Sequence, residues 1–310
     1  MAETILTGTK IVMAGCHELG YNLLRLLLEN QIIINYIVTI DQETAIKEKV
    51  SGYVDLREIA DKFDIPIYVA QKYSLKTTKD ISFFTENKFD LLIQGGWQRL
   101  FPEILLNTLS IGAVGVHGSS EFLPKGRGRS PINWSLIEGR ERFILHYFLM
   151  KPGVDDGEIF HYEMFDINVW DDCRTLYYKN TLLTSQVLLK FIPKLMSGDV
   201  EFYPQEGVVT YYPKRTEEDG RIDWMKSVLE IYNLVRGVTK PYPGAFCYSI
   251  NGKVRIWKAQ PFDTRIDHIQ YQYGQIIDVF NTGHFIIKCS GGLLLVTEFE
   301  GKINNHEILY

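Results

Sequence analysis

The chain of 310 residues lacks a basic excess, and it contains few cysteines. Its formal charge is −5, whereas a protein that wraps nucleic acid usually carries a surplus of lysine and arginine. The cysteines lie far apart and form no C-x-x-C pair, so we interpret them as buried thiols in a reducing compartment. A disulfide framework and a structural zinc site are therefore not expected. The four cysteines are Cys16, Cys173, Cys247 and Cys289.

Long hydrophobic runs are also missing near the N-terminus. The first ten residues, Met1–Lys10, are polar and have no apolar core of the kind that a secretory signal needs. The longest apolar stretch nearby, Ile32–Ile40, is interrupted by Asn35 and Tyr36 and is far shorter than the roughly 20 residues of a membrane-spanning helix. We expect a cytoplasmic protein without a membrane partner.

Several common catalytic and nucleotide-binding fingerprints are absent as well. The first strand-to-helix turn, Gly15–Gly20, reads GCHELG and is not the G-x-G-x-x-G of dinucleotide-binding proteins. No P-loop, H-E-x-x-H or G-x-S-x-G motif occurs anywhere in the chain. The sequence thus gives no support for a nicotinamide cofactor, an ATP-phosphate cradle, a zinc protease or a serine hydrolase.

What the chain does contain is enough apolar material for a core, with 45% hydrophobic and 13% aromatic residues. Its first part alternates short apolar runs with helical patterns, which indicates a parallel sheet covered on both faces. The expected strands are Ile11–Gly15, Ile32–Ile40, Ile65–Val69, Phe89–Gln94 and Ala113–His117, followed by Phe143–Met150 and Glu158–Phe165. The expected helices are Leu19–Leu28, Leu56–Phe63, Pro131–Ile137 and Leu176–Met196.

The last third of the chain has a different pattern. An irregular polar stretch, Gly207–Asp223, is typical of a linker, and Val228–Val235 is expected to be a short helix. From Ala245 onward short strands follow one another, and Asn251-Gly252 is a strong hairpin signal. We therefore predict two domains, residues 1–205 and 206–310, the second ending in a small barrel or sandwich.

Ligands of parallel α/β sheets bind at the carboxyl ends of the strands, which directs attention to the segments after Gly15, Gln94 and Val116. His117 lies at such an end, and the glycine-rich basic loop Lys125–Arg129 follows it. Ser130 and Pro131 then form the expected N-cap and first residue of a helix. His117 is a candidate general base, because the unperturbed pKa of histidine is near neutrality. A hydrogen-bonded structural histidine is the alternative.

Two further segments are candidates for the site. Asp155 and Asp156 lie in a Gly-Asp-rich turn that needs no function to explain it, although adjacent carboxylates can also polarise a histidine. The spacing does not establish that Asp155 meets His117. The segment Gly95–Leu100 follows another strand and suits a flat heterocycle, or else its Trp97 simply caps the core.

These motifs, taken in order, resemble the formyltransferases that use 10-formyltetrahydrofolate. The resemblance covers nearly the whole chain and includes both the histidine-centred loops and the C-terminal part. The matching segments are Gly115–His117, Leu123–Trp134, Asp155–Ile159, Lys214–Trp224, Val235–Phe246 and Ile256–Ala259.

The resemblance implies a Rossmann-like α/β domain followed by a small C-terminal β-barrel or OB-like domain. It implies no metal, and it makes His117 and Asp155 the catalytic residues. The resemblance assigns the other site residues to two groups. Gly96, Trp97, Gln98, Arg99, Leu100, Val154 and Asp156 would receive the folate, mostly through backbone groups, and Ser119, Arg127, Arg129 and Asn133 would receive the acceptor.

The chain departs from the family pattern at Gly115, where the family has an asparagine that supports the developing oxyanion. Losing one such donor costs about 100- to 1000-fold in rate. The loop that follows His117 is also two residues longer than usual. Three explanations remain: a replacement donor, a different substrate, or a protein that binds ligand without transfer. The candidate replacement donors are Ser119, Ser120, Gln98 and Asn133.

The acceptor is predicted to be a primary amine on a nucleotide-linked amino sugar. The loop around Lys125–Trp134 is closer to the sugar enzymes of the family than to the methionyl-tRNA formyltransferases. Residues 206–310 contain 12 Lys+Arg and 12 Asp+Glu, and this balance of zero disfavours a domain that grips tRNA phosphates. Methionyl-tRNA formyl transfer and a folate- or sugar-nucleotide-binding role remain the alternatives, and a homodimer is among the expected assemblies.

Overall fold

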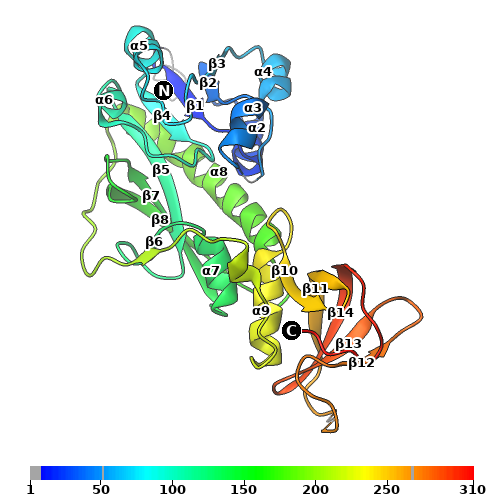
Figure 1. Ribbon diagram of the computed structural model, residues 1–310. Helices are drawn as coiled ribbons and strands as arrows, with labels where there is room; N and C mark the ends of the chain where they lie inside the picture. The colour runs from blue at the N-terminus through cyan, green and yellow to red at the C-terminus, as the bar shows by residue number, and fades with distance from the viewer. Residues whose placement is uncertain (1–7, 51, 267–268) are drawn as a thin grey trace. The chain divides into compact units, whose positions relative to one another are not determined.

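The computed structural model describes residues 8–50, 52–266 and 269–310. The chain forms two compact units, traced by colour in Figure 1. The first comprises Met1–Gly128, Ile144–Phe165 and Tyr177–Tyr211, and the second comprises Arg129–Phe143, Asp166–Leu176 and Tyr212–Tyr310. Two segments of the predicted domain 1–205 thus belong to the second unit, a division that a single boundary at residue 205 does not describe.

A seven-stranded sheet in the order β3-β2-β1-β4-β5-β7-β8 organises the first unit. The first five of these strands pair in parallel, and β7 is antiparallel to β5. The strands are β1 (Ile11–Ala14), β2 (Tyr36–Thr39), β3 (Ile67–Val69), β4 (Leu91–Gln94), β5 (Gly112–Ser119), β7 (Arg142–Leu149) and β8 (Glu158–Asp166). The helices are α2 (Glu18–Glu29), α3 (Gln42–Lys47), α4 (Arg57–Lys62), α5 (Thr78–Asn87), α6 (Glu103–Leu106) and α8 (Cys173–Ser197).

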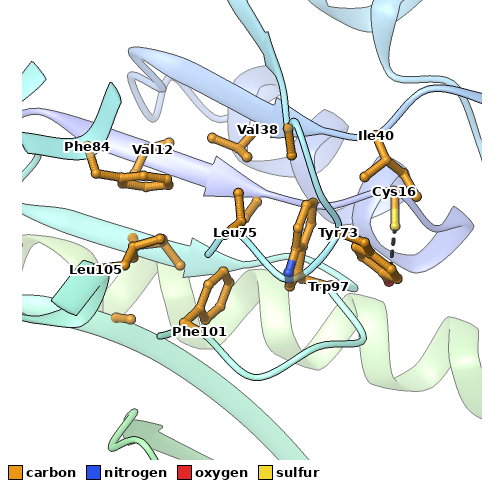
Figure 2. Packing of buried hydrophobic residues seen from close by; sticks show 14 of the residues in the cluster. Val12, Cys16, Val38, Ile40, Tyr73, Leu75, Phe84, Trp97, Phe101 and Leu105 are labelled. Atoms are coloured by element: carbon orange, nitrogen blue, oxygen red, sulfur yellow. Dashed lines mark hydrogen bonds between the residues drawn. The ribbon is translucent and has the colours of Figure 1, made fainter. Parts of the chain in front are cut away.

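One hydrophobic core of this unit lies between the strands and the helices and loops that cover them (Figure 2). Val12 and Val38 come from neighbouring strands, Phe84 comes from α5, and all three are fully buried. The side chains of Trp97 and Phe101 stack in the same cluster, with ring centroids 6.2 Å apart. Burying each such side chain stabilises the fold by about 1.5–3 kcal/mol, so this loop is anchored by its aromatic residues.

Glycine at positions 15 and 20 allows the first strand-to-helix turn to pack on the end of β4. A Cβ atom at Gly20 would lie 1.8 Å from the Gly95 carbonyl oxygen, and one at Gly15 would lie 2.3 Å from it. No side chain fits there without movement of backbone. The glycines of this turn are therefore explained by close packing of α2 against β4.

Replacing Gly20 by alanine is expected to destabilise the protein by about 1–3 kcal/mol, because the methyl group overlaps a backbone oxygen. The sign of the change in the free energy of unfolding is informative, since Gly→Ala inside a helix normally stabilises a protein by about 0.5–1 kcal/mol. Urea unfolding measures the difference, with Asn22→Ala on the partly exposed face of α2 as the control. A Gly20→Ala protein as stable as the wild type would contradict this packing.

Several elements of the first unit differ from the sequence-based expectation: β2 is shorter than predicted, and α3, α5 and α6 were not predicted. The strand predicted over Ile32–Ile40 is confined to β2, because Ile32 donates its amide to the Leu27 carbonyl at the end of α2. Helix α5 was not predicted, although Thr77 caps it by accepting a hydrogen bond from the Asp80 amide. Its apolar residues Ile81, Phe83 and Phe84 are too few for a clear helical period.

The second unit is built on a five-stranded antiparallel sheet in the order β10-β11-β14-β13-β12. One face packs against α9, whose residues Val228, Ile231 and Val235 enter a core shared with the strands. The fold class predicted from the sequence, an α/β unit followed by a β unit, is confirmed. The elements of the second unit are α7 (Pro131–Ile137), η1 (Glu218–Gly220), α9 (Val228–Val238), β10 (Ala245–Ser249), β11 (Gly252–Asp263), β12 (Ile276–Val279), β13 (Phe285–Cys289) and β14 (Gly292–Glu300).

Helix α7 joins this unit because it packs on α9. The Asn133 side-chain amide donates to the Gly237 carbonyl at 2.6 Å, and a Cβ atom at Gly237 would lie 3.3 Å from the Asn133 carbonyl oxygen. Pro131 is the first helical residue, as predicted. The predicted capping by Ser130 is wrong, because its backbone is left-handed, with φ 57°, and its hydroxyl makes no capping hydrogen bond.

Within the described ranges, no helix is both long and apolar enough to cross a membrane. All four cysteines are buried free thiols, as the sequence indicated.

Candidate active site

His117 lies in β5 with 7% of its surface exposed. Its Nε2 is 2.8 Å from the Gly126 carbonyl oxygen, in the loop that follows the strand. Since a carbonyl oxygen only accepts hydrogen bonds, Nε2 carries a proton and Nδ1 is left to interact elsewhere. This contact fixes the orientation of the ring.

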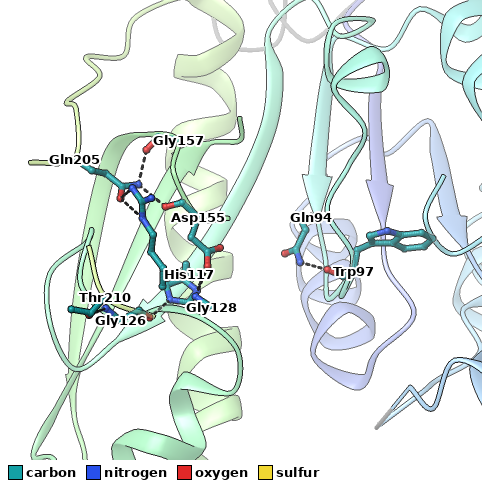
Figure 3. Close-up of polar contacts among 10 residues, drawn as sticks. Gln94, Trp97, His117, Gly126, Gly128, Asp155, Gly157, Gln205 and Thr210 are labelled. Atoms are coloured by element: carbon teal, nitrogen blue, oxygen red, sulfur yellow. Dashed lines mark hydrogen bonds and ion pairs between the residues drawn. The ribbon is translucent and has the colours of Figure 1, made fainter. Parts of the chain in front are cut away.

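Asp155 meets the other nitrogen of that ring (Figure 3). Its Oδ2 lies 3.3 Å from His117 Nδ1 and accepts a hydrogen bond from the Gly128 amide at 3.0 Å. A carboxylate facing a nitrogen lone pair would be repelled, so the close approach requires one proton between the two groups. The structure thus brings together His117 and Asp155, which sequence spacing alone did not join. The pair can hold or release a single proton.

Gln205 fastens the turn that carries Asp155 to the loop that carries Gly126. Its Nε2 donates to the Asp155 and Gly157 carbonyls at 2.8 Å each, and its Oε1 accepts from the Arg127 guanidinium at 2.6 and 3.1 Å. Sequence analysis missed this residue because a lone glutamine in a polar stretch carries no signal. Gln205 therefore holds the two loops of the site together and has no direct contact with the His117 ring in these hydrogen bonds.

Thr210 is a second support that the sequence did not reveal. Its hydroxyl accepts from the Gly126 amide at 2.8 Å, and its carbonyl accepts from the Arg127 amide. The adjacent strands β6 (Arg127–Gly128) and β9 (Tyr211–Tyr212) continue the same pairing. The Gly126 carbonyl, which orients His117, is therefore fixed because the amides on either side of it both bond Thr210.

The four predicted acceptor-binding residues have different environments. Ser119 and Asn133 are fully buried, and Arg127 is 9% exposed. Ser119 accepts from the Glu121 amide, and Arg127 is occupied by Gln205. Arg129 is exposed. Buried and already bonded side chains brace the loops, which leaves Arg129 as the one of the four with an exposed charge.

The predicted folate loop, residues 96–100, is held by Tyr73. The Tyr73 hydroxyl accepts from the Gln98 amide at 2.9 Å, and the Arg99 guanidinium lies 4.7 Å from the centre of its ring. Gly96 has a φ of 81° and Leu100 is exposed. Trp97 is 2% exposed, so its side chain belongs to the core and only its backbone is left for a ligand.

The Trp97 carbonyl is engaged by Gln94, whose amide donates to it at 2.7 Å. Figure 3 shows this pair as a polar group separate from the one around His117 and Asp155. Gln98, named as one candidate replacement donor, belongs to this loop. The structure therefore provides no hydrogen bond between the folate loop and His117 among the described residues.

The turn after β7 presents the other two predicted folate contacts. Val154 is 37% exposed, and Asp155 has a left-handed backbone with φ 49°. Asp156 is partly buried, and its Oδ1 has no hydrogen-bond partner among the residues that the structure covers. An unpaired buried oxygen is available to accept a hydrogen bond from a ligand.

Gly115 faces the same side of β5 as His117 and is covered by apolar side chains. It pairs with Phe148 of β7. A Cβ atom at position 115 would lie 2.9 Å from Phe148 Cε2 and 2.8 Å from Met150 Cγ. The space that an asparagine side chain needs is therefore occupied by hydrocarbon.

Cys16 lies beneath the predicted folate loop and contacts the Tyr73 hydroxyl at 3.4 Å. Burial raises the pKa of its thiol to about 11, with the Tyr73 hydrogen bond opposing the shift. Burial also raises the pKa of Tyr73. Both groups are therefore neutral near pH 7 and serve to hold the loop.

Comparison with known proteins agrees with this architecture. The profile described as "Formyl transferase" matches residues 43–192, and "Formyl transferase, C-terminal domain" matches residues 214–306. The methionyl-tRNA formyltransferase of Enterococcus faecalis is 30% identical over 254 residues, which cover 82% of this chain and 80% of that protein. This chain belongs to the formyl transferase family.

The chain is also similar to a longer bifunctional protein and to a solved N-formyltransferase. The bifunctional polymyxin resistance protein ArnA of Wigglesworthia glossinidia brevipalpis is 30% identical over 81% of this chain, which spans only 38% of that longer protein. The N-formyltransferase of Helicobacter canadensis, solved with folinic acid and dTDP-3-aminofucose, shares the fold with a TM-score of 0.64. It is 18% identical, over 94% of this chain and 100% of that one. The protein is a formyltransferase.

Proposed function

We propose that this enzyme transfers the formyl group of 10-formyltetrahydrofolate to the primary amine of a nucleotide-linked amino sugar. The observation that carries the chemistry is the contact between His117 Nδ1 and Asp155 Oδ2, with His117 Nε2 fixed by the Gly126 carbonyl. This arrangement supplies an acid–base pair whose imidazole ring is held in one orientation. Amine acylation needs such a pair because the nucleophile must lose a proton.

The proposed reaction begins with a neutral amine, whose lone pair attacks the formyl carbon. A new C–N bond forms, and the carbonyl oxygen becomes an oxyanion in the tetrahedral intermediate. Collapse of the intermediate breaks the bond to N10 of the folate, and the proton that the His117–Asp155 pair holds goes to N10. The nitrogen of the new amide then loses its extra proton to the pair, which restores the starting state. Asp155, with 21% of its side chain exposed against 7% for His117, is the member that faces outward.

The folate is proposed to bind along residues 96–100 and the turn at Val154–Asp156. Backbone groups near Gly96 and Gln98 and the unpaired Asp156 Oδ1 would serve the pterin, a flat ring with several donors and acceptors. Arg99, already held by Glu48 at 2.9 Å, would stay at the rim of this site. None of these contacts requires a metal.

A small charged acceptor is favoured over tRNA by the charge of the C-terminal part. Residues 206–310 carry equal numbers of basic and acidic side chains, 12 each. Several of the basic side chains also form ion pairs. Lys253 and Arg255 both contact Glu217. Lys240 and Lys258 both contact Glu298. These contacts partly neutralise four of the twelve basic side chains, which weakens the attraction for a phosphate backbone.

Tetrahydrofolate release from 10-formyltetrahydrofolate, followed by absorbance, tests the proposal. We expect release that depends on one member of a panel of UDP- and dTDP-linked amino sugars, with a formylated sugar as the product by mass spectrometry. Charged initiator tRNA is the parallel acceptor, and its binding would weaken steeply with salt. Release with tRNA alone would assign the other acceptor, and folate binding without release would indicate a binding protein.

A further inference from the structure

His146 is a second buried histidine next to the proposed catalytic pair. It lies in β7 directly opposite His117 of β5, so both side chains emerge on the same face of the sheet. Only 1% of its surface is exposed. None of the family motifs discussed above includes it.

The two imidazoles hold opposite ends of one turn. His146 Nε2 accepts a hydrogen bond from the Leu123 amide at 3.3 Å, and His117 Nε2 donates to the Gly126 carbonyl at 2.8 Å. Between these points the Lys125 amide donates to the Phe122 carbonyl at 3.0 Å, which closes the turn. One histidine therefore accepts at the start of the turn and the other donates at its end.

These contacts determine the protonation of His146. A nitrogen that accepts a backbone N–H carries no proton, so the neutral ring keeps its proton on Nδ1. Burial and, to a smaller extent, the charge of the nearby His117 lower the pKa of His146 to about 4, and a hydrogen bond to the His117 backbone opposes this shift. The His146 ring is consequently neutral at pH 7 and places no second positive charge beside His117.

We propose that His146 is a positioning residue, a neutral hydrogen-bond acceptor that anchors the turn at Leu123 and so keeps the Gly126 carbonyl where it orients His117. Without this anchor the start of the turn loses its partner, and the turn that carries the Gly126 carbonyl is held on the Thr210 side but no longer on the Leu123 side. His117 Nδ1 would then meet Asp155 less often. The kinetic part of this inference rests on the proposed function.

Two substitutions separate the acceptor from the volume of the ring. His146→Gln retains an acceptor oxygen, whereas His146→Leu retains bulk and removes the acceptor. We expect His146→Leu to lower kcat by about 10- to 100-fold with the KM of the formyl donor changed less than about threefold, as for a misplaced catalytic group. His146→Gln is expected to keep kcat within about threefold of the wild type and to leave the pH profile unmoved. Equal activity of His146→Leu and wild type, or equal loss in both variants, would overturn the proposal.

A control and a second readout keep the test independent of the acceptor. His161→Gln alters another partly buried histidine of the sheet, which bonds Glu163 at 3.0 Å, and is expected to behave as wild type. In 15N-histidine NMR of the folded protein without substrate, His146 should be the neutral Nδ1–H tautomer from pH 5.5 to 8.5. The His117 resonances should shift in His146→Leu but not in His146→Gln. A His146 that titrates within this range, or His117 resonances unmoved in His146→Leu, would refute the positioning role even if the sugar acceptor is wrong.

Discussion

Replacing Asp155 by asparagine is expected to lower kcat by about 100- to 10,000-fold, the range that one acid–base group contributes. The amide oxygen still accepts from the Gly128 amide, so the turn keeps its geometry. What is lost is the carboxylate that shares a proton with His117 Nδ1. Because the folate contacts proposed for this turn involve Val154 and Asp156, and the turn keeps its geometry, both KM values should change far less than kcat.

The matched control is Glu158→Gln, which neutralises an exposed carboxylate three residues away that lies 3.7 Å from the Lys151 ammonium group. Its kcat should equal that of the wild type. The double variant His117→Asn with Asp155→Asn should be about as slow as either single variant, because the two residues share one proton and act as a unit. Near-normal turnover of Asp155→Asn, or additive losses in the double variant, would contradict the assigned role.

Restoring the family asparagine with Gly115→Asn is expected to destabilise the protein by about 1–3 kcal/mol and to leave kcat no higher than that of the wild type. The reason is steric, because Phe148 and Met150 occupy the space where the new side chain would begin. The Gly115 backbone φ is outside the left-handed region, so no conformational strain is expected in addition. Chemical denaturation, read as a shift of the midpoint at constant slope, measures the cost.

A second substitution identifies the group that causes the clash. In a Phe148→Leu background the added cost of Gly115→Asn should fall, with a coupling of about 0.5–3 kcal/mol between the two positions. If Gly115 were a vacant donor position, the single variant would be stable and faster than the wild type. That result would show that Phe148 is not an obstacle and that the missing donor alone limits the rate.

The helices and strands were predicted best where the local signal was strong. Alternation of apolar runs with helical periods identified the parallel sheet, and Asn251-Gly252 marked the hairpin between β10 and β11. The signals failed at α5, whose apolar residues are sparse, and at Ser130, whose backbone conformation is imposed by its surroundings. Local sequence carries propensity and periodicity, and it does not carry the constraint that neighbouring segments place on a backbone.

The sequence by itself determined the fold class, the formyltransferase resemblance and the choice of His117 and Asp155 as candidates. Only the tertiary structure decided that these two side chains meet, since they are 38 positions apart in the chain and come from different elements. It also decided that Trp97 serves the core and that Phe148 fills the space beside Gly115. Gln205, Thr210 and His146 came to light in the same way. Each acts through hydrogen bonds to residues distant in sequence, and such contacts leave no pattern in a single chain.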